Sequence, residues 1–241
     1  MTTDTTTGLG RRLVDRFFLG ATVAELELLT PRLLAVALTG PALRDLDWTP
    51  GQQVRVQVGG SGMLGALRTY SVWDYRETIL ELRIYLHGSG QGADWARRVR
   101  VGDRVSLRPP EGRFVTHPGA YHLFAGEDTA AVAFGAMLRE LDLAVPVHGV
   151  LETETAADRL SLPRAGELTW ISRDGGSAAD SARLVEAVAA LELPDQPGLA
   201  YLAGEARTCQ MVRRHLVAER GWPRRSVLVK PFWAPGRRGM D

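Results

Sequence analysis

The sequence predicts two successive domains, an antiparallel β-barrel or β-sandwich followed by an α/β domain with a mostly parallel sheet. In the first half, apolar and polar residues alternate over short stretches, as they do in strands with one buried face. In the second half, short apolar strands alternate with stretches of helical periodicity, which is typical of a parallel sheet covered by helices. The length of 241 residues is enough for two domains of ordinary size.

Alternating strands occupy the first half, and glycine or proline pairs separate them. Strands are expected at residues 53–58, from Arg68 onward, at 82–87 and at 101–107, the last opening with the turn Gly102-Asp103. Turns are expected at Pro50-Gly51, Gly59-Gly60, Pro109-Pro110 and Pro118-Gly119. Several short strands at such spacing favour an antiparallel barrel or sandwich.

The pattern changes to alternating strands and helices near residues 114–120. Strands are expected at residues 121–125, 145–151, 168–172 and 199–203, and helices at 130–141, 179–191 and 205–220. The first of these helices has apolar residues at helical spacing, so we expect one of its faces to be buried. The organisation predicted from these patterns is a disordered tail at residues 1–15, a first domain at 16–118 and a second domain at 119–241.

Composition excludes several classes of protein. With 45% hydrophobic and 24% charged residues, the chain has the composition of a globular protein. Its apolar runs are shorter than the ~20 residues that span a bilayer, and its Thr-rich start has no signal-peptide pattern. We therefore expect a cytoplasmic protein without a membrane span, and a monomer by default. The single Cys209 excludes an internal disulfide, and the histidines lack metal-ligand spacing, so no metal site is expected.

Charge is balanced over the whole chain but concentrated near its C-terminal end. The 29 basic and 28 acidic residues give a net charge of +1, which argues against a nucleic-acid-binding protein. Between Arg207 and Arg238, however, nine basic residues accompany a single acid, Glu219. We expect this segment to attract phosphate, an anionic small molecule or an acidic protein.

The tetrapeptide Arg68-Thr69-Tyr70-Ser71 is the first candidate binding motif. Alternation places Arg68 and Tyr70 on the same face of a strand. A guanidinium group there can pair with a diphosphate, while the phenol ring covers a flat heterocycle. Ser71 can offer that heterocycle its hydroxyl and its N–H group. The same four residues are compatible with an ordinary strand that carries an exposed arginine and a packed tyrosine.

A glycine-rich turn over residues 87–96, His-Gly-Ser-Gly-Gln-Gly-Ala-Asp-Trp-Ala, is the second candidate. Such a turn before a helix presents free backbone N–H groups, which suit a phosphate. It lacks the glycine spacing of a dinucleotide fingerprint and the Lys-Ser/Thr pair of a P-loop. A plain strand–helix connection is therefore an alternative interpretation.

Two further turns, Gly126-Glu127-Asp128-Thr129 and Gly204-Glu205-Ala206, each lie between a strand and a helix of the second half. Open parallel sheets bind ligands at the carboxyl ends of their strands, where these turns are expected. The acidic residues are also expected to cap the helices that follow.

In their order and spacing, these stretches resemble the siderophore-interacting protein family, the FAD-containing ferric-siderophore reductases related to ferredoxin reductases. The similarity extends from about Leu26 to Gly236. The shared stretches are Leu29-Thr30-Pro31-Arg32, Leu38-Thr39-Gly40, Arg68 to Val72, His87-Gly88 with Trp95-Ala96, Ala125 to Ala130, Gly204-Glu205-Ala206 with Arg213-Arg214-His215-Leu216, and Phe232-Trp233 with Gly236.

The resemblance implies a ferredoxin-reductase-type barrel that binds FAD, followed by an α/β domain that binds NADPH or NADH. It implies that a ferric siderophore is the substrate. A hydride would pass from the nucleotide to FAD, and FAD would pass single electrons to Fe(III), which releases Fe(II). On this reading no residue is needed as a catalytic acid, base or nucleophile.

Carried over by position, the resemblance also implies individual contacts. FAD would meet Arg68, Thr69, Tyr70, Ser71, His87, Gly88, Gly92, Ala93 and Trp95, with Arg68 on the diphosphate. Thr129, Gly204 and Glu205 would border the nicotinamide, and Phe232 and Trp233 would lie near the exposed face of the flavin. The basic residues Lys230, Arg237 and Arg238 would hold the anionic ferric chelate.

Some positions depart from the family pattern. Gly90-Gln91-Gly92-Ala93 stands where Gly-Pro-Ala-Ser/Thr is usual, so Ala93 lacks a hydroxyl donor, and Ala234 replaces a common arginine. Two alternatives stay open: a flavin reductase that serves a ferredoxin or an oxygenase, and a flavin-free binding protein. Selectivity between NADPH and NADH is expected to depend on residues 153–159 and on Arg173.

Overall fold

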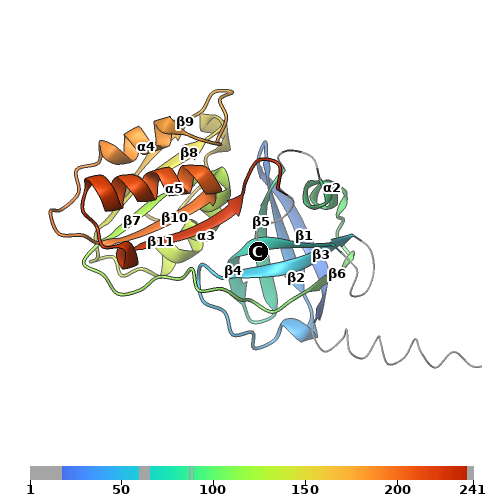
Figure 1. The fold of residues 1–241 in the computed structure, drawn as a ribbon. Coiled ribbons are helices and arrows are strands. Elements are labelled where there is room, and N and C mark those ends of the chain that lie inside the picture. Colours follow the sequence, from blue (N-terminus) through green and yellow to red (C-terminus); the bar gives the residue numbers. More distant parts are fainter. Residues whose placement is uncertain (1–17, 60–65, 87, 89, 238–241) are drawn as a thin grey trace, which may run out of the picture. The chain divides into compact units, whose positions relative to one another are not determined.

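The computed structural model describes residues 18–59, 66–86, 88 and 90–237, and it divides the chain into two compact units between Gly112 and Arg113 (Figure 1). The sequence predicts this boundary slightly later, between residues 118 and 119. The intervening segment packs with the second unit, because the Phe114 and Tyr201 ring centroids are 5.9 Å apart and the His117 N–H group donates to the Tyr201 hydroxyl at 2.9 Å.

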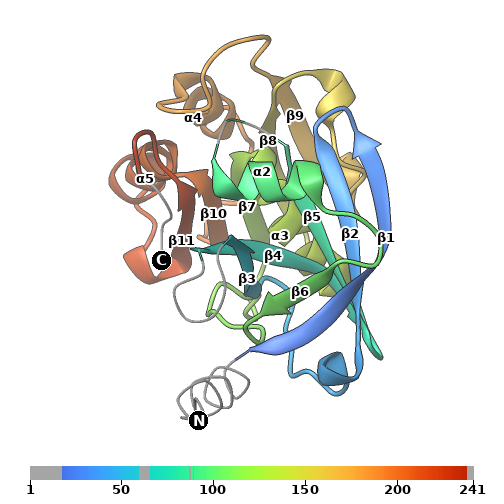
Figure 2. The ribbon, with the colours of Figure 1, turned by 90° about the vertical axis from the view of Figure 1, so that its right-hand side faces the viewer.

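The first unit is a closed barrel of antiparallel strands in the order β1-β2-β5-β4-β3-β6 (Figure 2). The strands are β1 (Leu19–Thr30), β2 (Leu33–Thr39), β3 (Gln53–Gly59), β4 (Ala66–Arg76), β5 (Ile79–Tyr85) and β6 (Arg104–Leu107), accompanied by helix α2 (Gln91–Arg98). The long strand β1 closes the barrel, because its first residues pair with β6 and the rest pair with β2. Of the two predicted architectures, the barrel is therefore confirmed.

Alternation along the strands fills the barrel interior. Val54, Val56 and Val58 of β3 are buried, whereas Arg55 and Gln57 between them are partly exposed. Leu80, Leu82 and Ile84 of β5 join the same core. Complete burial of each such side chain contributes roughly 1.5–3 kcal/mol of transfer free energy.

Strand β6 is shorter than the sequence predicts, because it begins at Arg104 rather than near Val101. The turn before it is fastened to β1 by two backbone hydrogen bonds. The Gly102 N–H group donates to the Val23 carbonyl at 2.8 Å, and the Val23 N–H group donates to the Asp103 carbonyl at 2.9 Å.

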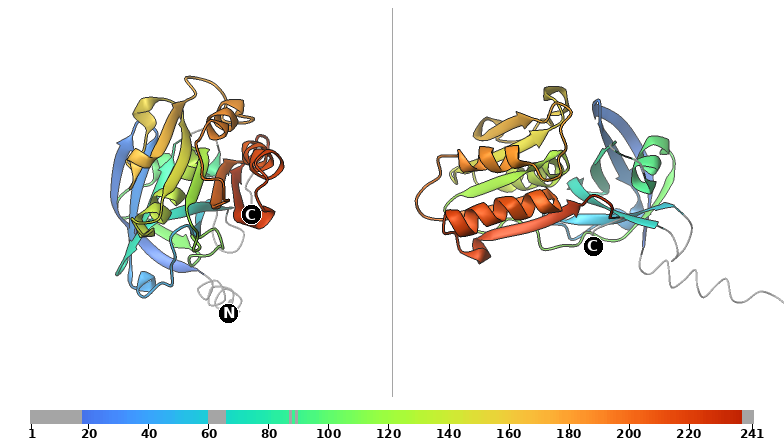
Figure 3. Two further views of the ribbon diagram at one scale, coloured as in Figure 1. Left: turned by 90° about the vertical axis from the view of Figure 1, so that its left-hand side faces the viewer. Right: turned by 45° about the horizontal axis from the view of Figure 1, so that its top comes forward.

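The second unit contains a five-stranded sheet in the order β11-β10-β7-β8-β9, in which every pair is parallel (Figure 3). The strands are β7 (His122–Glu127), β8 (Val147–Thr153), β9 (Leu168–Ser172), β10 (Leu199–Glu205) and β11 (Val227–Trp233). The helices are α3 (Asp128–Glu140), α4 (Ala182–Ala189) and α5 (Ala206–Arg214). This arrangement confirms the predicted parallel sheet covered by helices.

Helices cover both faces of this sheet. On one face, Leu184 and Val188 of α4 and Cys209 and Val212 of α5 pack in one apolar cluster with strand residues such as Leu123. Burial raises the pKa of the Cys209 thiol, as expected for a core residue rather than a nucleophile. On the other face, the ring centroids of Phe134 in α3 and Phe124 in β7 are 5.1 Å apart.

The helices differ from the predictions in three respects. Helix α3 is buried along Ala130–Leu138 on nearly all sides instead of one. Helix α4 begins at Ala182 because Ser181 caps it, with Oγ accepting from the Leu184 N–H group at 3.1 Å. Helix α5 continues as a π-helix over His215–Glu219. Within the described ranges, no helix is long and apolar enough to cross a membrane.

Candidate functional site

The first candidate site lies in the barrel unit, where β4 meets the start of α2. Arg68 and Tyr70 share one face of β4, because they stand opposite Val56 and Val54 of the neighbouring strand. Arg68 Nη1 donates to the Leu67 carbonyl at 2.7 Å, and Arg68 Nη2 donates to Gln91 Oε1 at 3.1 Å. The guanidinium group is thus directed along the first turn of α2.

Gly92 allows α2 to approach Arg68 and Tyr70 closely. A methyl group at this position would lie 3.0 Å from Tyr70 Oη and 3.2 Å from Arg68 Cγ. The Tyr70 hydroxyl donates to the Gly92 carbonyl at 3.4 Å, and the Tyr70 and Trp95 ring centroids are 5.9 Å apart with 33° between the planes. Residues about 20 positions apart therefore form one surface of aromatic rings and a cation.

The chemistry of this surface suits a flavin nucleotide. The first N–H groups of a helix have no partner within the helix, and Gly90 before α2 offers no side-chain cap. These N–H groups and the Arg68 guanidinium supply the donors that a diphosphate requires. Burial raises the pKa of Tyr70, although Arg68 opposes the shift, so the phenol keeps its proton near neutral pH. The residues present therefore fit FAD.

The other predicted FAD contacts have different positions. Thr69 and Ser71 stand opposite Arg55 and Gln53, on the other face of β4 from Arg68. Gly88 has a φ of 65°, and Ala93 lies half-buried in the first turn of α2. His87 lies outside the described residues.

The second candidate site lies at the carboxyl ends of β7, β10 and β11 in the second unit, and it is organised by Glu127. This carboxylate is 2% exposed and caps α3, accepting from the Thr129 N–H group at 3.1 Å and from the Thr129 hydroxyl. Trp233 Nε1 donates to the same carboxylate at 2.9 Å. The predicted residues Thr129 and Trp233 thus meet at one acid.

Gly204 brings the end of β10 against Glu127. Its φ is 115°, and a methyl group there would lie 2.6 Å from Glu127 Oε1. Strand order reverses here, since β8 and β9 lie on one side of β7 while β10 and β11 lie on the other. In open parallel sheets this switch point is where ligands bind.

Glu205 caps α5 in the same manner as Glu127 caps α3, which confirms both predicted caps. Its carboxylate is 1% exposed and accepts from the N–H groups of Arg207 at 3.0 Å and Thr208 at 2.8 Å, and from the Thr208 hydroxyl at 3.0 Å. Burial opposes its charge, but these hydrogen bonds lower its pKa below the ordinary value.

A buried ion pair between Asp128 and Arg173 joins the start of α3 to the end of β9. Arg173 also pairs with Glu154 at 3.2 Å. Burial raises the pKa of Asp128 to about 6, against the effect of Arg173, and the Glu127 and Asp158 carboxylates shift it in the same direction as burial.

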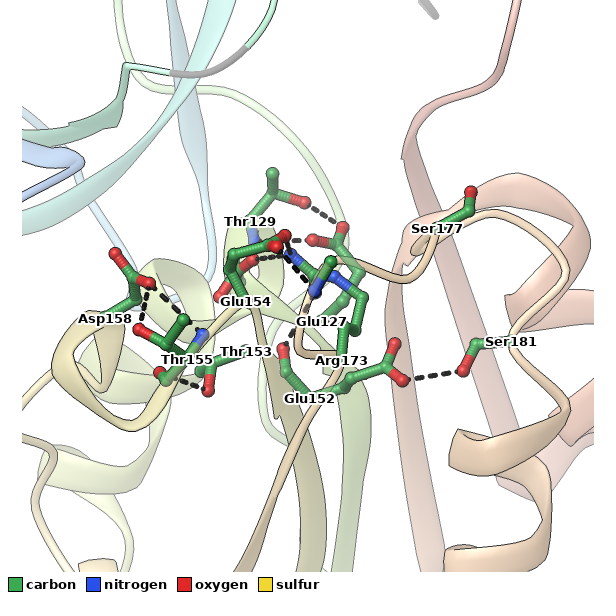
Figure 4. A network of polar contacts seen from close by, with 12 residues as sticks. Glu127, Thr129, Glu152, Thr153, Glu154, Thr155, Asp158, Arg173, Ser177 and Ser181 are labelled. Atoms are coloured by element: carbon green, nitrogen blue, oxygen red, sulfur yellow. Dashed lines mark hydrogen bonds and ion pairs between the residues drawn. The ribbon is translucent and has the colours of Figure 1, made fainter.

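Carboxylates at the end of β8 hold the loop between β9 and α4. Glu152 Oε1 accepts from the Ser181 hydroxyl at 2.8 Å (Figure 4). Glu154 Oε1 accepts from the Gly175 N–H group at 3.0 Å. Burial raises the pKa of Glu152, while Ser181 and Arg173 partly offset this effect. Acidic residues therefore hold the loops at the carboxyl ends of β7 and β8 in fixed positions.

The sequence predicts ligand binding at the turn that contains Glu127, Asp128 and Thr129, but of these three turn residues it assigns a contact only to Thr129, and it does not identify Glu152. The only local signal of the three acidic residues is an acidic side chain at a strand end, which is also the signal of an ordinary helix cap. Lys230 and Phe232 lie half-buried on β11, and Arg237 follows it exposed. Arg238 lies outside the described residues.

A closed antiparallel barrel followed by a five-stranded parallel sheet is the fold of ferredoxin-reductase-like flavoproteins. Phthalate dioxygenase reductase, for example, superposes with a TM-score of 0.70 at 16% identity, covering 91% of this chain and 70% of that chain. Residues 55–114 match the siderophore-interacting FAD-binding domain, and residues 119–236 match the siderophore-interacting protein domain. The chain belongs to the siderophore-interacting protein family.

Solved structures show the same fold over nearly the whole chain. A siderophore utilization protein from T. fusca has a TM-score of 0.81 at 23% identity, covering 93% of this chain and 95% of that chain. The siderophore-interacting protein SipS from Aeromonas hydrophila has a TM-score of 0.79 at 24% identity, covering 92% of this chain and 93% of that chain.

The curated relatives match over a smaller share of their length. Ferric vibriobactin reductase ViuB of Vibrio cholerae is 29% identical over 180 residues, which cover 70% of this chain and 65% of ViuB. The NADPH-dependent ferric-chelate reductase of Escherichia coli is 24% identical over 160 residues, which cover 64% of this chain and 60% of that protein. The matched region thus spans less than two thirds of these relatives.

Proposed function

We propose that this protein is a flavin-dependent reductase of ferric siderophores that takes its electrons from NADPH or NADH. The observation that carries the proposal is the Arg68–Tyr70–Gly92 contact, which sets a cation, an aromatic ring and a helix N-terminus on one surface inside a matched FAD-binding domain. The names of the relatives ViuB and the Escherichia coli ferric-chelate reductase support the substrate class.

In this proposal Arg68 and the N–H groups of Gly92 and Ala93 hold the FAD diphosphate, and Tyr70 and Trp95 lie against the isoalloxazine. Thr69, Ser71, His87 and Gly88 complete the flavin contacts. Bound FAD would accept a hydride from the nucleotide and deliver single electrons to iron, which links a two-electron donor to a one-electron acceptor. The protein residues bind and orient, and none acts as a catalytic acid or base.

The nucleotide is assigned to the switch point of the parallel sheet. Thr129, Gly204 and Glu205 border it, and Trp233 is oriented there by its hydrogen bond to Glu127. The substrate is an anionic ferric chelate, which Lys230, Arg237 and Arg238 would attract, and Phe232 would lie near the exposed face of the flavin. Hard siderophore oxygens hold Fe(II) weakly, so reduction releases the metal.

An absorption spectrum tests the proposal directly. The purified protein is recorded before and after addition of FAD, then with NADH or NADPH, and finally with a ferric siderophore. We expect a flavin spectrum that bleaches with a nucleotide and recovers with the chelate. Flavin that stays oxidised with both nucleotides would point to a protein electron donor, and absence of flavin binding would reject the reductase function.

A further inference from the structure

We propose that the second unit selects NADH over NADPH and that Glu154 is the specificity-determining residue. Asp158, four positions later in the chain, adds a second carboxylate to the same loop. The inference rests on the proposed function, because it names which of two nucleotides supplies the electrons. The two differ only by a phosphate on the 2′-hydroxyl of the adenosine ribose. Selectivity between them therefore depends on the protein groups that contact the ribose 2′-oxygen.

Strand order places that ribose near the end of β8. A dinucleotide lies across the switch point of an open parallel sheet, where an acidic side chain binds the ribose 2′-hydroxyl or an arginine accommodates a 2′-phosphate. Here the switch lies between β7 and β10, and β8 is the neighbour of β7 on the other side. Strand β8 ends at Thr153, so Glu154 is the first residue beyond it.

This end of β8 is acidic. The Glu154 side chain is 22% exposed, so a ligand can reach it, and Gly175 N–H holds its Oε1 atom at 3.0 Å. The Asp158 carboxylate accepts from the Thr155 N–H group at 3.2 Å and from the Thr155 hydroxyl at 2.7 Å (Figure 4). Asp128 and Glu152 add two further carboxylates at the same edge.

The buried cation of this network, Arg173, is already engaged. It is 7% exposed, and its Nη2 atom bonds both Asp128 and Glu154. A 2′-phosphate could reach it only by displacing one of these carboxylates, which would leave a buried charge uncompensated. Arg183 is also engaged, because its Nη1 atom donates to the carbonyls of Ser172 at 2.8 Å and Arg173 at 3.0 Å.

Unpaired acceptors give a second, independent indication. Asp128 Oδ1 and Glu152 Oε2 are buried and have no hydrogen-bond partner in the part of the chain that the structure describes. This edge therefore holds acceptors in excess of donors. A ribose hydroxyl can donate to the partly exposed Glu154 carboxylate, whereas a phosphate with about two negative charges would be repelled by these carboxylates.

The test compares two nucleotide halves that carry no nicotinamide. Binding of ADP-ribose and of 2′-phospho-ADP-ribose to the full chain is measured by titration calorimetry, alongside KM for NADH and NADPH in the FAD-loaded protein with ferricyanide as acceptor. We expect ADP-ribose to bind at least about tenfold more tightly, a difference of about 1.4 kcal/mol. The KM values should show the same preference.

Variants assign the preference to a residue. Glu154→Gln removes one charge and should bring the two affinities to within about threefold of each other. Glu192→Gln is the matched control, because Glu192 is exposed in the loop that leads from α4 to the amino end of β10. Its ratio of the two affinities should stay at the wild-type value. The wild-type comparison stands even if Glu154→Gln folds poorly.

Each failure has its own signature. If the wild-type chain binds 2′-phospho-ADP-ribose as tightly as ADP-ribose, or more tightly, the inference is overturned, even though NADH or NADPH still reduces the flavin. Loss of that binding in Arg159→Gln would then assign the 2′-phosphate to Arg159. An unchanged ratio in folded Glu154→Gln removes this residue from the role. If neither half binds and neither nucleotide reduces the flavin, the proposed electron donor fails as well.

Discussion

Replacing Gly92 with alanine should separate flavin binding from stability. Gly92 lies in the first turn of α2, and the added methyl group would stand 3.0 Å from Tyr70 Oη and 3.2 Å from Arg68 Cγ. Ordinary contacts of this kind begin near 3.4 Å, so both side chains must move by a few tenths of an ångström. These are the two side chains that we assign to the flavin.

The magnitudes follow from opposing effects. Overpacking costs about 1–3 kcal/mol, whereas alanine in place of glycine in a helix gains about 0.5–1 kcal/mol. The free energy of unfolding of the flavin-free protein should therefore fall by at most about 2.5 kcal/mol. A hydrogen bond to a charged group contributes about 1.5–3 kcal/mol, so a displaced Arg68 should weaken FAD binding by about 10- to 100-fold.

Equilibrium dialysis with FAD and urea unfolding of the flavin-free protein measure the two quantities. Gly166→Ala is the matched control, because a methyl group at Gly166 meets nothing within 4 Å, and we expect it to leave FAD affinity unchanged. Wild-type FAD affinity in Gly92→Ala would refute the reasoning. So would an equal loss of affinity in the control.

Three further predictions concern the two sites. Arg68→Ala should weaken FAD binding about tenfold or more, measured by the same dialysis, whereas Arg76→Ala, which removes an exposed arginine of the same strand, should not. Gly204→Ala should destabilise the protein by about 1–3 kcal/mol in urea unfolding, because its φ of 115° is strained for alanine and the methyl group meets Glu127; a wild-type midpoint would contradict this. The pKa of Asp128 is raised from 3.8 to about 6, so its ionised form costs stability at neutral pH, and this cost disappears as the pH falls from about 6 to about 4. Relative to Asp128→Asn, the wild-type protein should therefore gain up to about 3 kcal/mol of unfolding free energy between pH 7 and pH 4, and a difference independent of pH would contradict the assignment.

Local periodicity was sufficient to predict the order of the two domains and most of the elements of the second. Strand β9 has the predicted bounds, and β10 begins at the predicted Leu199. These strands are buried and short, so their apolar runs stand out from the polar turns on either side. The order of the motifs along the chain was also sufficient to predict the family.

Strands without a clean pattern escaped prediction. The register between β1 and β2 shifts near Val23 and again near Leu28, so apolar residues of β1 do not alternate regularly. Strand β11 pairs with one neighbour and contains Pro231, a residue that argues against a strand except at a sheet edge. Neither segment has the local signature on which a sequence-based assignment depends.

The contacts that build the sites depend on which strands become neighbours. Trp233 reaches Glu127 because β10 lies between β7 and β11, and Arg173 reaches Asp128 because β8 lies between β7 and β9. Gly92 meets Tyr70 because α2 lies against β4. Hydrophobic periodicity reports which side of a segment is buried, but it carries no information on which distant segment covers it. The chemistry of each residue could thus be read from the chain, whereas its partners were set by the packing of the folded protein.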